Sequence, residues 1–293
     1  MANLEQLINE KTAADSQWRQ QRQTERQSIT EMQDNEIEHI TTDPAAYARY
    51  LNVQADNMTY SPGNIALVMA QSPTATIFGT MERWRNMGRN VRNDELGKGI
   101  DIFARAESGK GYSMTAAYDI SQTDGREPRK PLQLTDESKE MEAALKALLN
   151  YSTVPVVADT EMEAPAFYDQ GNLELAINPA YSDSEAFIAI AAEVAHARFH
   201  DRGYNSDYIR ADSELDAQSV SYILCRRFGV SRDLPDLSRL ADLYKGWMPE
   251  ERRAILDGIQ KWSKKIGYSI EKEITPPQRS IPVTRRPPKQ NTR

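Results

Sequence analysis

The sequence contains a single cysteine, Cys225, among its 293 residues. An internal disulfide is therefore excluded, and such scarcity of cysteine is typical of proteins in a reducing cytoplasm. The sequence also lacks any run of the roughly 18–20 consecutive apolar residues that a membrane-spanning helix needs. Its first residues, MANLEQLINEK, show no basic start followed by an apolar stretch, so no secretory signal is expected. These absences favour a cytoplasmic protein without a membrane partner.

The net charge of −7 argues, taken alone, against nucleic acid as a partner. Two stretches of the chain are nevertheless basic and free of acidic residues. The first is the arginine-rich segment 83–92, and the second is the segment 274–293, whose prolines and basic residues predict an extended, disordered tail. Their basic residues are Arg83, Arg85, Arg89 and Arg92 in the first, and Arg279, Arg285, Arg286, Lys289 and Arg293 in the second.

The hydrophobic pattern predicts an α+β protein with five successive parts. The boundary between its two domains is placed where TDGREPRKPLQLTDES combines two prolines, a glycine and mixed charges with no apolar period. The predicted parts are a polar helical arm (1–40), a small α+β domain (41–122), a linker (123–138), a mainly helical domain with a short β-sheet (139–273) and the basic tail (274–293).

Within 41–122, Asp43-Pro44 predicts the start of a helix, because an N-cap residue is followed by proline at the first helical position. SPGN (61–64) ends that helix, and Ser61 or Asn64 is expected to cap a short apolar helix after it. A further short helix is expected from Met81 to about Gly88. Strands are expected in TATIFGT (74–80), KGIDIFARA (98–106) and GYSMTAAYDISQT (111–123), the last two forming a hairpin with SGKG (108–111) as its turn.

The second domain should contain long helices and a β-hairpin. The hairpin is expected in APAFYDQGNLELAINP, with its turn at DQGN (169–172). Ser182 or Asp183 is a fitting cap for the helix that follows, and Gly229 for the end of the next one. Helical patterns cover 139–151, 182–201, 210–229, 234–246 and 249–274.

The helix over 182–201 contains AAEVAHARFHD (191–201), which matches the second half of the zinc-protease motif H-E-x-x-H. Glu193 and His196 occupy the motif positions, but Ala192, which cannot bind a metal, stands where the first histidine belongs. The strand LELAI (173–177) precedes this helix, and in zincins such a strand lies beside the cleft. The next helix offers Asp212, Glu214 and Asp216 as a third ligand.

A second arrangement places the metal one helical turn further on. His196 and His200 are four residues apart and share a helical face with Glu193, so they and Asp216 or Glu214 would form a mixed site. In the alternative arrangement without metal, His196 is packed inside the domain and His200 is exposed near the helix end. Because loss of one ligand gives up much of the binding free energy, the sequence favours a protein with no cofactor and no peptidase activity.

Trp84 lies among the arginines of 83–92, and Tyr60 precedes the SPGN turn. Guanidinium groups on phosphates and bases stacked on aromatic rings are how proteins bind single strands, at about 1–3 kcal/mol per stacked base. The alternative is that Trp84 belongs to the core and the arginines only solvate its helix. Since no module that reads base sequence is visible, little base specificity is expected.

The first half of the chain resembles the N-terminal single-stranded-DNA-binding domain of ArdC-type antirestriction proteins and their LtrC-like relatives on conjugative plasmids. The second half resembles the zincin-like metallopeptidase domain that follows in that family and also occurs in ImmA/IrrE proteins. The features that carry the first resemblance are YSPGN (60–64), Gln71-Ser72-Pro73, Trp84, Gly88-Arg89, Val91, Lys98-Gly99-Ile100 and Tyr118 to Thr123. Those that carry the second are LELAINP, AAEVAHARFHD and LDAQSVSYILCRRFGV.

The resemblance implies a DNA-binding protein of a mobile element that protects or handles transferred single strands. By motif position, Glu193 matches the catalytic glutamate, His196 the second zinc histidine and Asp216 the downstream acidic ligand, which is usually glutamate. Ala192 departs from the first histidine. The leading hypothesis is therefore a non-enzymatic, sequence-tolerant single-stranded-DNA-binding protein, antirestriction-like, with a degenerate zincin domain. Its predicted DNA-binding residues are Tyr60, Arg83, Trp84, Arg85, Arg89, Arg92 and Lys98.

Two alternatives remain open from the sequence. The first is a zinc metallopeptidase with a rearranged site of Glu193, His196, His200 and Asp216. The second is a non-catalytic protein that docks a protein partner through the arm 1–40 or the basic tail 274–293.

Overall fold

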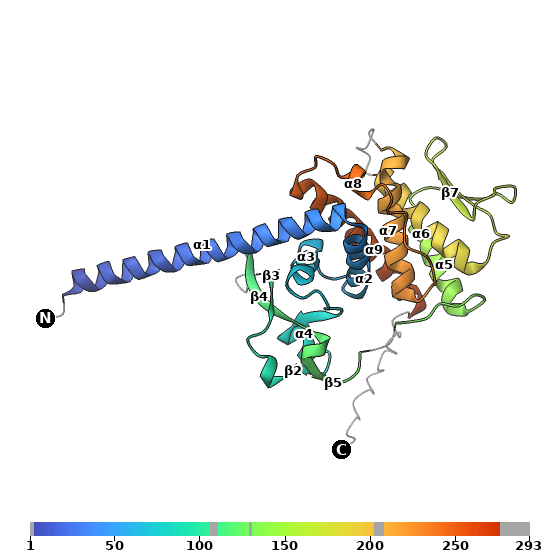
Figure 1. Cartoon of the computed structure of the whole chain (residues 1–293). Coiled ribbons are helices and arrows are strands. Elements are labelled where there is room, and N and C mark those ends of the chain that lie inside the picture. The colour runs from blue at the N-terminus through green and yellow to red at the C-terminus, as the bar shows by residue number, and fades with distance from the viewer. Residues whose placement is uncertain (1–2, 106–110, 129–130, 202–207, 276–293) are drawn as a thin grey trace, which may run out of the picture.

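A computed structural model describes residues 3–105, 111–128, 131–201 and 208–275. In this part of the chain long helices accompany three small sheets, which confirms the predicted α+β class (Figure 1). The helices are α1 (Leu4–Thr42), α2 (Pro44–Asp56), α3 (Pro62–Gln71), α4 (Met81–Asn86), α5 (Lys139–Tyr151), α6 (Asp183–His200), α7 (Arg210–Phe228), α8 (Leu240–Leu243) and α9 (Pro249–Ile274). The strands are β1 (Phe78–Thr80), β2 (Arg89–Val91), β3 (Ile100–Arg105), β4 (Tyr112–Asp119), β5 (Thr123–Gly125), β6 (Val156–Ala158), β7 (Ala166–Asp169) and β8 (Glu174–Ile177).

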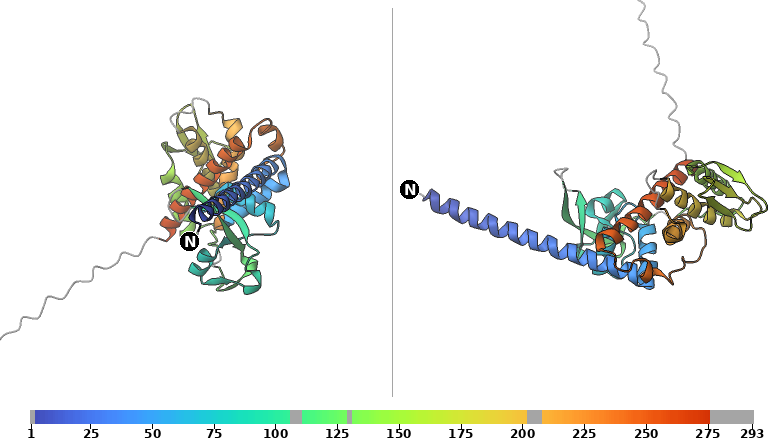
Figure 2. Two further views of the ribbon diagram at one scale, coloured as in Figure 1. Left: turned by 90° about the vertical axis from the view of Figure 1, so that its left-hand side faces the viewer. Right: turned by 90° about the horizontal axis from the view of Figure 1, so that it is seen from above.

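Helix α1 is a single rod that joins the core only along its second half. Its buried residues begin at Ile29 and continue through Ile37 and Ile40, whereas the side chains before Ile29 are almost all exposed. Figures 1 and 2 show this first half extending away from the rest of the molecule. The guanidinium of Arg26 lies 5.8 Å from the Phe103 ring centroid, so the rod contacts the β3–β4 hairpin where it leaves the body. The predicted arm is thus a continuous helix whose end belongs to the core.

Helices α2 and α3 begin where capping chemistry predicts. The Asp43 carboxylate accepts a hydrogen bond from the Ala46 backbone N–H at 2.8 Å, and Pro44 is the first helical residue. The Ser61 hydroxyl accepts from the Asn64 N–H at the start of α3. Every residue of α3 from Pro62 to Met69 is buried, as the apolar run from Ile65 to Ala70 indicates.

Two amide side chains of α3 bind the outer edge of β3. Asn64 accepts from the Phe103 N–H at 2.9 Å and donates to the Phe103 carbonyl at 2.8 Å. Gln71 does the same with Asp101, at 3.0 Å and 2.9 Å. Each amide thus makes the pair of hydrogen bonds that a neighbouring strand would make. These contacts satisfy an edge that would otherwise be open to another chain.

The first sheet has the order β1-β4-β3, and β3 and β4 form the predicted antiparallel hairpin. Most of its predicted turn, 108–110, lies outside the described residues. The strand expected from Thr74 is shorter, because the Thr76 N–H donates to the Asp119 carboxylate and the Thr76 carbonyl accepts from Asn57. The backbone of Thr76 therefore forms its hydrogen bonds with side chains, and β1 begins only at Phe78.

Strands β2 and β5 pair as a separate two-stranded sheet. Strand β5 covers Thr123–Gly125, which are the first residues of the predicted linker. The start of that segment therefore belongs to the structure of the first half.

The second half contains the sheet β6-β8-β7, in which β7 and β8 form the predicted hairpin. Its turn forms because the Asp169 carboxylate accepts from the N–H groups of Gly171 at 2.7 Å and Asn172 at 3.1 Å. Ser182 caps α6 in a capping box with Glu185. Gly229 ends α7 with a left-handed φ of 69°.

The apolar core is continuous between the two halves of the chain. Helix α2 packs on α7, where the Tyr47 and Ser219 hydroxyls are 2.9 Å apart and the Tyr222 hydroxyl donates to Asn52. The predicted linker at 123–138 therefore joins two segments of the sequence that share one core, and their division into two domains remains a prediction. Among the described helices none is both long and apolar enough to cross a bilayer.

Replacement of Asn64 or Gln71 by alanine is expected to destabilise the protein by about 1–3 kcal/mol each, because two backbone groups of β3 lose their partners. Urea unfolding followed by circular dichroism measures this change. Gln20→Ala, on the exposed half of α1, is the matched control and should change the free energy of unfolding by less than about 0.5 kcal/mol. Equal, small effects at all three positions would show that the amides do not hold the edge.

Candidate functional site

The residues of the zinc-protease-like segment lie where α6 meets β7 and the start of α7. Glu193, His196 and His200 lie along the face of α6 that contacts Tyr168, Tyr208 and Arg210. The strand beside them is β7, through Tyr168, whereas the predicted strand 173–177 corresponds to β8 in the middle of the sheet. The hairpin that contains the predicted strand therefore lies beside α6, and its other strand, β7, makes the direct hydrogen bond to Glu193.

Glu193 is buried, and each of its carboxylate oxygens accepts at least one hydrogen bond. Its side chain is 7% exposed. One carboxylate oxygen accepts from Arg210 Nη2 at 2.7 Å, and the other accepts from Arg210 Nη1 at 2.9 Å and from the Tyr168 backbone N–H at 2.7 Å. This bidentate pair is the strong form of an arginine–carboxylate contact. The charge of the buried carboxylate is thus balanced by a guanidinium.

Arg210 also reaches the other acidic residue of the site. Its Nε lies 3.9 Å from the Glu214 carboxylate, and its guanidinium carbon lies 4.7 Å from the centroid of the exposed Phe167 ring. Arg210 therefore stands between Glu193 and Glu214, in the region where a metal ion shared by the two helices would be expected.

His196 is completely buried, and both of its ring nitrogens have partners. Nδ1 is 2.8 Å from the Tyr208 hydroxyl, and Nε2 is 3.2 Å from Glu214. Burial raises the pKa of the Tyr208 phenol, so the hydroxyl keeps its hydrogen and donates it to Nδ1. In the neutral ring, Nε2 then carries the hydrogen and donates it to Glu214. The hydrogen bond from His196 is the main reason why the pKa of Glu214 falls to about 2.

His200 belongs to a different set of contacts. Its Nδ1 lies 2.6 Å from the Tyr168 hydroxyl, and its ring stacks on Tyr208 with centroids 4.8 Å apart. Tyr208 therefore contacts both histidines, its hydroxyl on His196 and its ring face on His200.

Asp216, the predicted acidic ligand, points elsewhere. Two residues along a helix turn by about 200°, so Asp216 faces away from Glu214 and His196. Its carboxylate is hydrogen-bonded by Tyr244 and lies near Tyr47, on the side of α7 that packs against α2. Burial raises its pKa to about 7. The assignment of Asp216 as a ligand is therefore wrong, and Glu214 takes its place beside His196.

The donor set of this site does not fit a resident metal ion. The Glu193 oxygens face Arg210 and the Tyr168 N–H, and His196 Nε2 presents a hydrogen to Glu214. Within the described ranges, no three His, Cys, Asp or Glu side chains come together in a geometry for a metal. A guanidinium beside the carboxylates is a built-in cation, which a second cation would have to displace.

Trp84 and Arg89, predicted to face DNA, belong to the interior. Trp84 is 0% exposed, and its indole N–H donates to the Tyr118 carbonyl at 2.9 Å. Arg89 is 7% exposed and donates to the Thr123 hydroxyl, the Thr123 carbonyl and the Arg126 carbonyl, each at 2.8 Å. These contacts join β2 to β5. The prediction that Trp84 stacks on bases is contradicted, because its ring has no open face.

The remaining predicted residues lie at or near the surface. Arg92 donates to the Ser121 carbonyl and is ion-paired with Asp94 and Glu95, so most of its charge is balanced. Tyr60 is half-buried between Phe78, at 4.4 Å between ring centroids, and the Arg83 guanidinium, at 5.0 Å. Lys98 is exposed and 3.5 Å from Glu95, and Arg85 is exposed. No single groove around Trp84 gathers these side chains.

Arg210, Tyr168 and Tyr208 are not among the residues predicted from the sequence. The zinc-protease motif indicates metal ligands, and it does not indicate a protein cation in place of the metal. The available signal was indirect. Arg210 precedes Glu214 by four residues, which places a cation and an anion on the same helical face. Together with Ala192 at the position of the first histidine, this spacing indicates that a side chain of the protein supplies a cation at the site.

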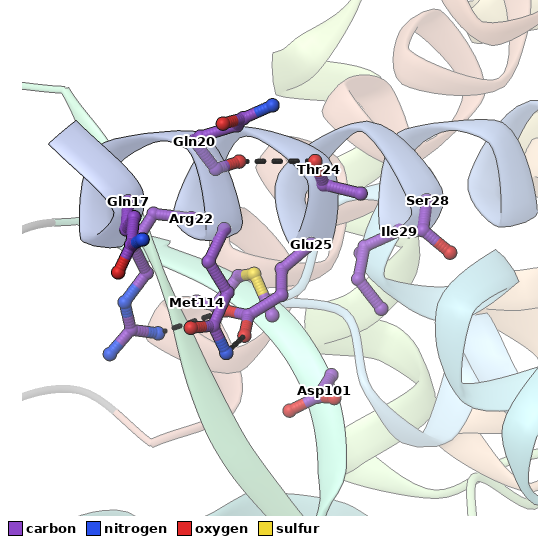
Figure 3. Close-up of a pocket in the computed structure, with 10 residues that line it drawn as sticks. Gln17, Gln20, Arg22, Thr24, Glu25, Ser28, Ile29, Asp101 and Met114 are labelled. Atoms are coloured by element: carbon purple, nitrogen blue, oxygen red, sulfur yellow. Dashed lines mark hydrogen bonds and ion pairs between the residues drawn. The ribbon is translucent and has the colours of Figure 1, made fainter.

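A surface hollow, separate from the site on α6, lies between α1 and the β3–β4 hairpin and is shown in Figure 3. Its polar side chains come mainly from the exposed half of α1 and bind one another. Glu25 accepts from Gln21 at 3.1 Å and from Arg22 at 3.2 Å. The titratable side chains that line this hollow within the described structure, Arg22, Glu25 and Asp101, are not buried.

Replacement of Arg210 by methionine is expected to destabilise the protein by about 3 kcal/mol, because it leaves the buried Glu193 carboxylate without its partner. The double variant Glu193→Gln/Arg210→Met should recover much of this loss, since the glutamine oxygen still accepts from the Tyr168 N–H. Chemical unfolding of the four proteins of this double-mutant cycle gives the coupling free energy. Additive effects of the two substitutions would contradict the pairing.

The raised pKa of Asp216 predicts a specific pH dependence of stability. Because its folded pKa is about 7 and its ordinary value is 3.8, the contribution of this group is complete below about pH 4 and is lost as the pH rises to about 7. The Tm of Asp216→Asn, relative to wild type, should therefore increase between pH 4 and pH 8. Asp242→Asn, at an exposed position of α8, is the matched control. A pH-independent difference for Asp216→Asn would contradict the assignment.

Comparison with known proteins gives distant similarities. No protein-family model matches the chain. An uncharacterized protein of Bacillus anthracis, pXO2-81, is 20% identical over 314 aligned residues, which cover 87% of this chain and 53% of that protein, so the chain spans about half the length of this relative. Two similar crystal structures are those of the antirestriction protein ArdC from plasmid R388. The Mn(II)-bound form has a TM-score of 0.45 and 18% identity over 75% of this chain and 86% of that chain. The metal-free form has a TM-score of 0.43 and 15% identity over 73% and 85%.

Proposed function

We propose that this chain binds single-stranded DNA with little base preference, in an antirestriction-like role on a mobile element, and that its α6–α7 lobe is non-hydrolytic. The observation that carries the second part is the bidentate contact between Arg210 and Glu193. The first part is supported by the ArdC-like motif residues and by the exposed cations of the first half.

The motif residues that resemble ArdC form one hydrogen-bonded framework. Asn64 and Gln71 bind the edge of β3, and Trp84 donates to the Tyr118 carbonyl. Asp119 accepts from Thr76, and Thr123 accepts from Arg89. Residues spread over sixty positions of the sequence thus act together to build one unit. This supports the view that the resemblance reflects a shared architecture for the first half, with its DNA-binding role.

Among the predicted DNA-binding cations, Arg85 and Lys98 are exposed, and Arg83 is half-buried beside Thr59. Since Arg89 and Trp84 are structural, these three side chains replace the larger set suggested by sequence. Contacts to phosphate from such side chains carry no base information. Binding that tolerates any sequence is therefore expected.

In a zinc peptidase the glutamate beside the metal accepts a proton from metal-bound water. Glu193 here has both oxygens occupied by Arg210 and the Tyr168 N–H. The carboxylate is thus bound as a structural anion and has no free oxygen directed at a water molecule. We infer that the lobe supports the fold and does not cleave peptides.

Fluorescence anisotropy with a labelled oligothymidine of about 30 nucleotides tests the DNA-binding part. The affinity should fall with salt, with a log–log slope of about −0.7 for each phosphate contact, and a mixed-sequence strand should bind equally well. Duplex DNA of the same length should bind more weakly. Absence of binding, or affinity that does not respond to salt, would refute this part.

Metal analysis of the purified full-length chain tests the second part. The chain should contain far less than one equivalent of zinc or manganese after incubation with the metal and desalting. Stoichiometric metal that disappears in His196→Ala would overturn the assignment of a structural lobe and revive the metallopeptidase.

A second candidate function is docking of a protein partner through α1. Leu4, Leu7 and Ile8 are 67%, 52% and 55% exposed, and Trp18 is 60% exposed, on the half of α1 that extends from the body. An exposed apolar stripe of this kind fits another helix. Truncation of residues 1–28 should then abolish a helix-mediated association seen by light scattering and leave oligonucleotide binding intact. A chain that is monomeric with and without this segment, and that binds no partner, would exclude this candidate.

A further inference from the structure

Helix α9 presents a row of basic residues on the side opposite its core face. Its buried residues include Trp262, Ile266 and Ile270. The exposed residues Lys261, Lys264, Lys265, Tyr268 and Lys272 lie at intervals that return to one side of a helix. The row from Lys261 to Lys272 is about 16 Å long at 1.5 Å per residue.

This row forms one wall of a groove of about 750 Å³, which we call the α9 groove. The other wall includes Arg83 of α4 and Thr59, which are joined by a hydrogen bond of 2.8 Å. A neighbouring hollow of about 850 Å³ is continuous with the α9 groove, since Arg83, Arg227 and Glu271 line both. The groove therefore brings the arginine-rich segment of the first half together with the last helix of the second half.

The charge in the α9 groove is positive and largely uncompensated. The acidic residues that line it are Asp56 and Glu271, and each is already ion-paired with an arginine of α7, Arg226 and Arg227 respectively. Among the described residues, Lys264, Lys265 and Lys272 form no ion pair, and the ammonium of Lys265 lies 5.3 Å from the centroid of the Trp262 ring. Ammonium groups held close together without counterions are favourable for a polyanion.

The groove also contains an exposed aromatic ring. Tyr268 is 70% exposed and stands between Lys265 and Lys272 in the row. Stacking on such a ring requires a base whose face is free, which a single strand offers and a duplex does not. Phosphates spaced along a strand match a row of ammonium groups, so the combination selects single-stranded nucleic acid over an acidic peptide.

We propose that the α9 groove is the principal binding site for single-stranded nucleic acid, with Lys264, Lys265, Lys272 and Arg83 on phosphates and Tyr268 stacked on a base. This inference rests on the proposed function and assigns the site to a helix that the ArdC-like motif residues do not include. This site would bind a single strand of nucleic acid without any contact to Trp84, which is buried.

The test uses the full-length chain and labelled oligothymidine across a salt series. Neutralisation in Lys264→Gln/Lys265→Gln/Lys272→Gln should weaken binding at least about tenfold at low salt and reduce the magnitude of the log–log slope by about 2, because three phosphate contacts are lost. Tyr268→Ala should weaken binding about fivefold or more with an unchanged slope, since stacking involves no counterion release. Tyr268→Phe should bind like wild type.

The matched control is Arg19→Gln/Lys139→Gln/Lys245→Gln, which removes the same charge at exposed positions outside the groove. It should change neither affinity nor slope appreciably. All substituted side chains are exposed, and thermal unfolding verifies that the variants are folded.

The outcomes separate the two proposals. If wild type binds and the groove variant matches the control, the α9 groove is refuted and the proposed function stands. If wild type binds no oligonucleotide, both are refuted. If polyglutamate competes as well as oligothymidine and Tyr268→Ala has no effect, the groove is a site for acidic polypeptides and the assignment is wrong.

Discussion

The second half of this protein depends on how the charge of one buried carboxylate is balanced. Once α6 packs beneath β7, Glu193 is removed from water, and an isolated carboxylate there would be strongly unfavourable. The guanidinium of Arg210 and the N–H of Tyr168 compensate it. This fixes the start of α7 against α6, and Tyr208 and Glu214 then contact His196 from the same side. A helix whose sequence resembles part of a hydrolytic centre thus contacts its neighbours through these same side chains.

The first half depends on a similar use of polar groups for architecture. Two side-chain amides, an indole N–H, a carboxylate and a guanidinium form hydrogen bonds with backbone groups of this half. Short strands and short helices leave many such groups without partners, and each would cost free energy if buried alone. The residues that make the sequence look familiar are mainly these. Because these residues are bound within the fold, a ligand site has to be sought among the side chains on the surface of this half.

Much of the fold was predictable because local chemistry determines it. Asp43 and Ser61 cap their helices, DQGN forms the hairpin turn, and Gly229 ends α7. Burial across long sequence separations was not predictable in the same way. An arginine-flanked tryptophan is compatible with a surface or with a core, and only the contact of Trp84 with β4 decides between them. Which of Glu214 and Asp216 faces His196 depends on the rotation of α7 about its own axis, and the sequence does not determine that rotation. The lysines of α9 do not stand out in the sequence, because Glu271 and Glu273 flank the last of them. Their neighbour Arg83 comes from almost two hundred residues earlier in the chain.

The protruding half of α1 has a consequence for how the size of the molecule is measured. Residues 4–28 extend a rod of about 38 Å from the body, which is close to the width of the body expected for this chain length. An elongated particle diffuses more slowly than a sphere of equal mass. Its elution volume in gel filtration will correspond to a sphere heavier than 33.2 kDa, and a monomer will resemble a dimer unless its mass is obtained from scattered light.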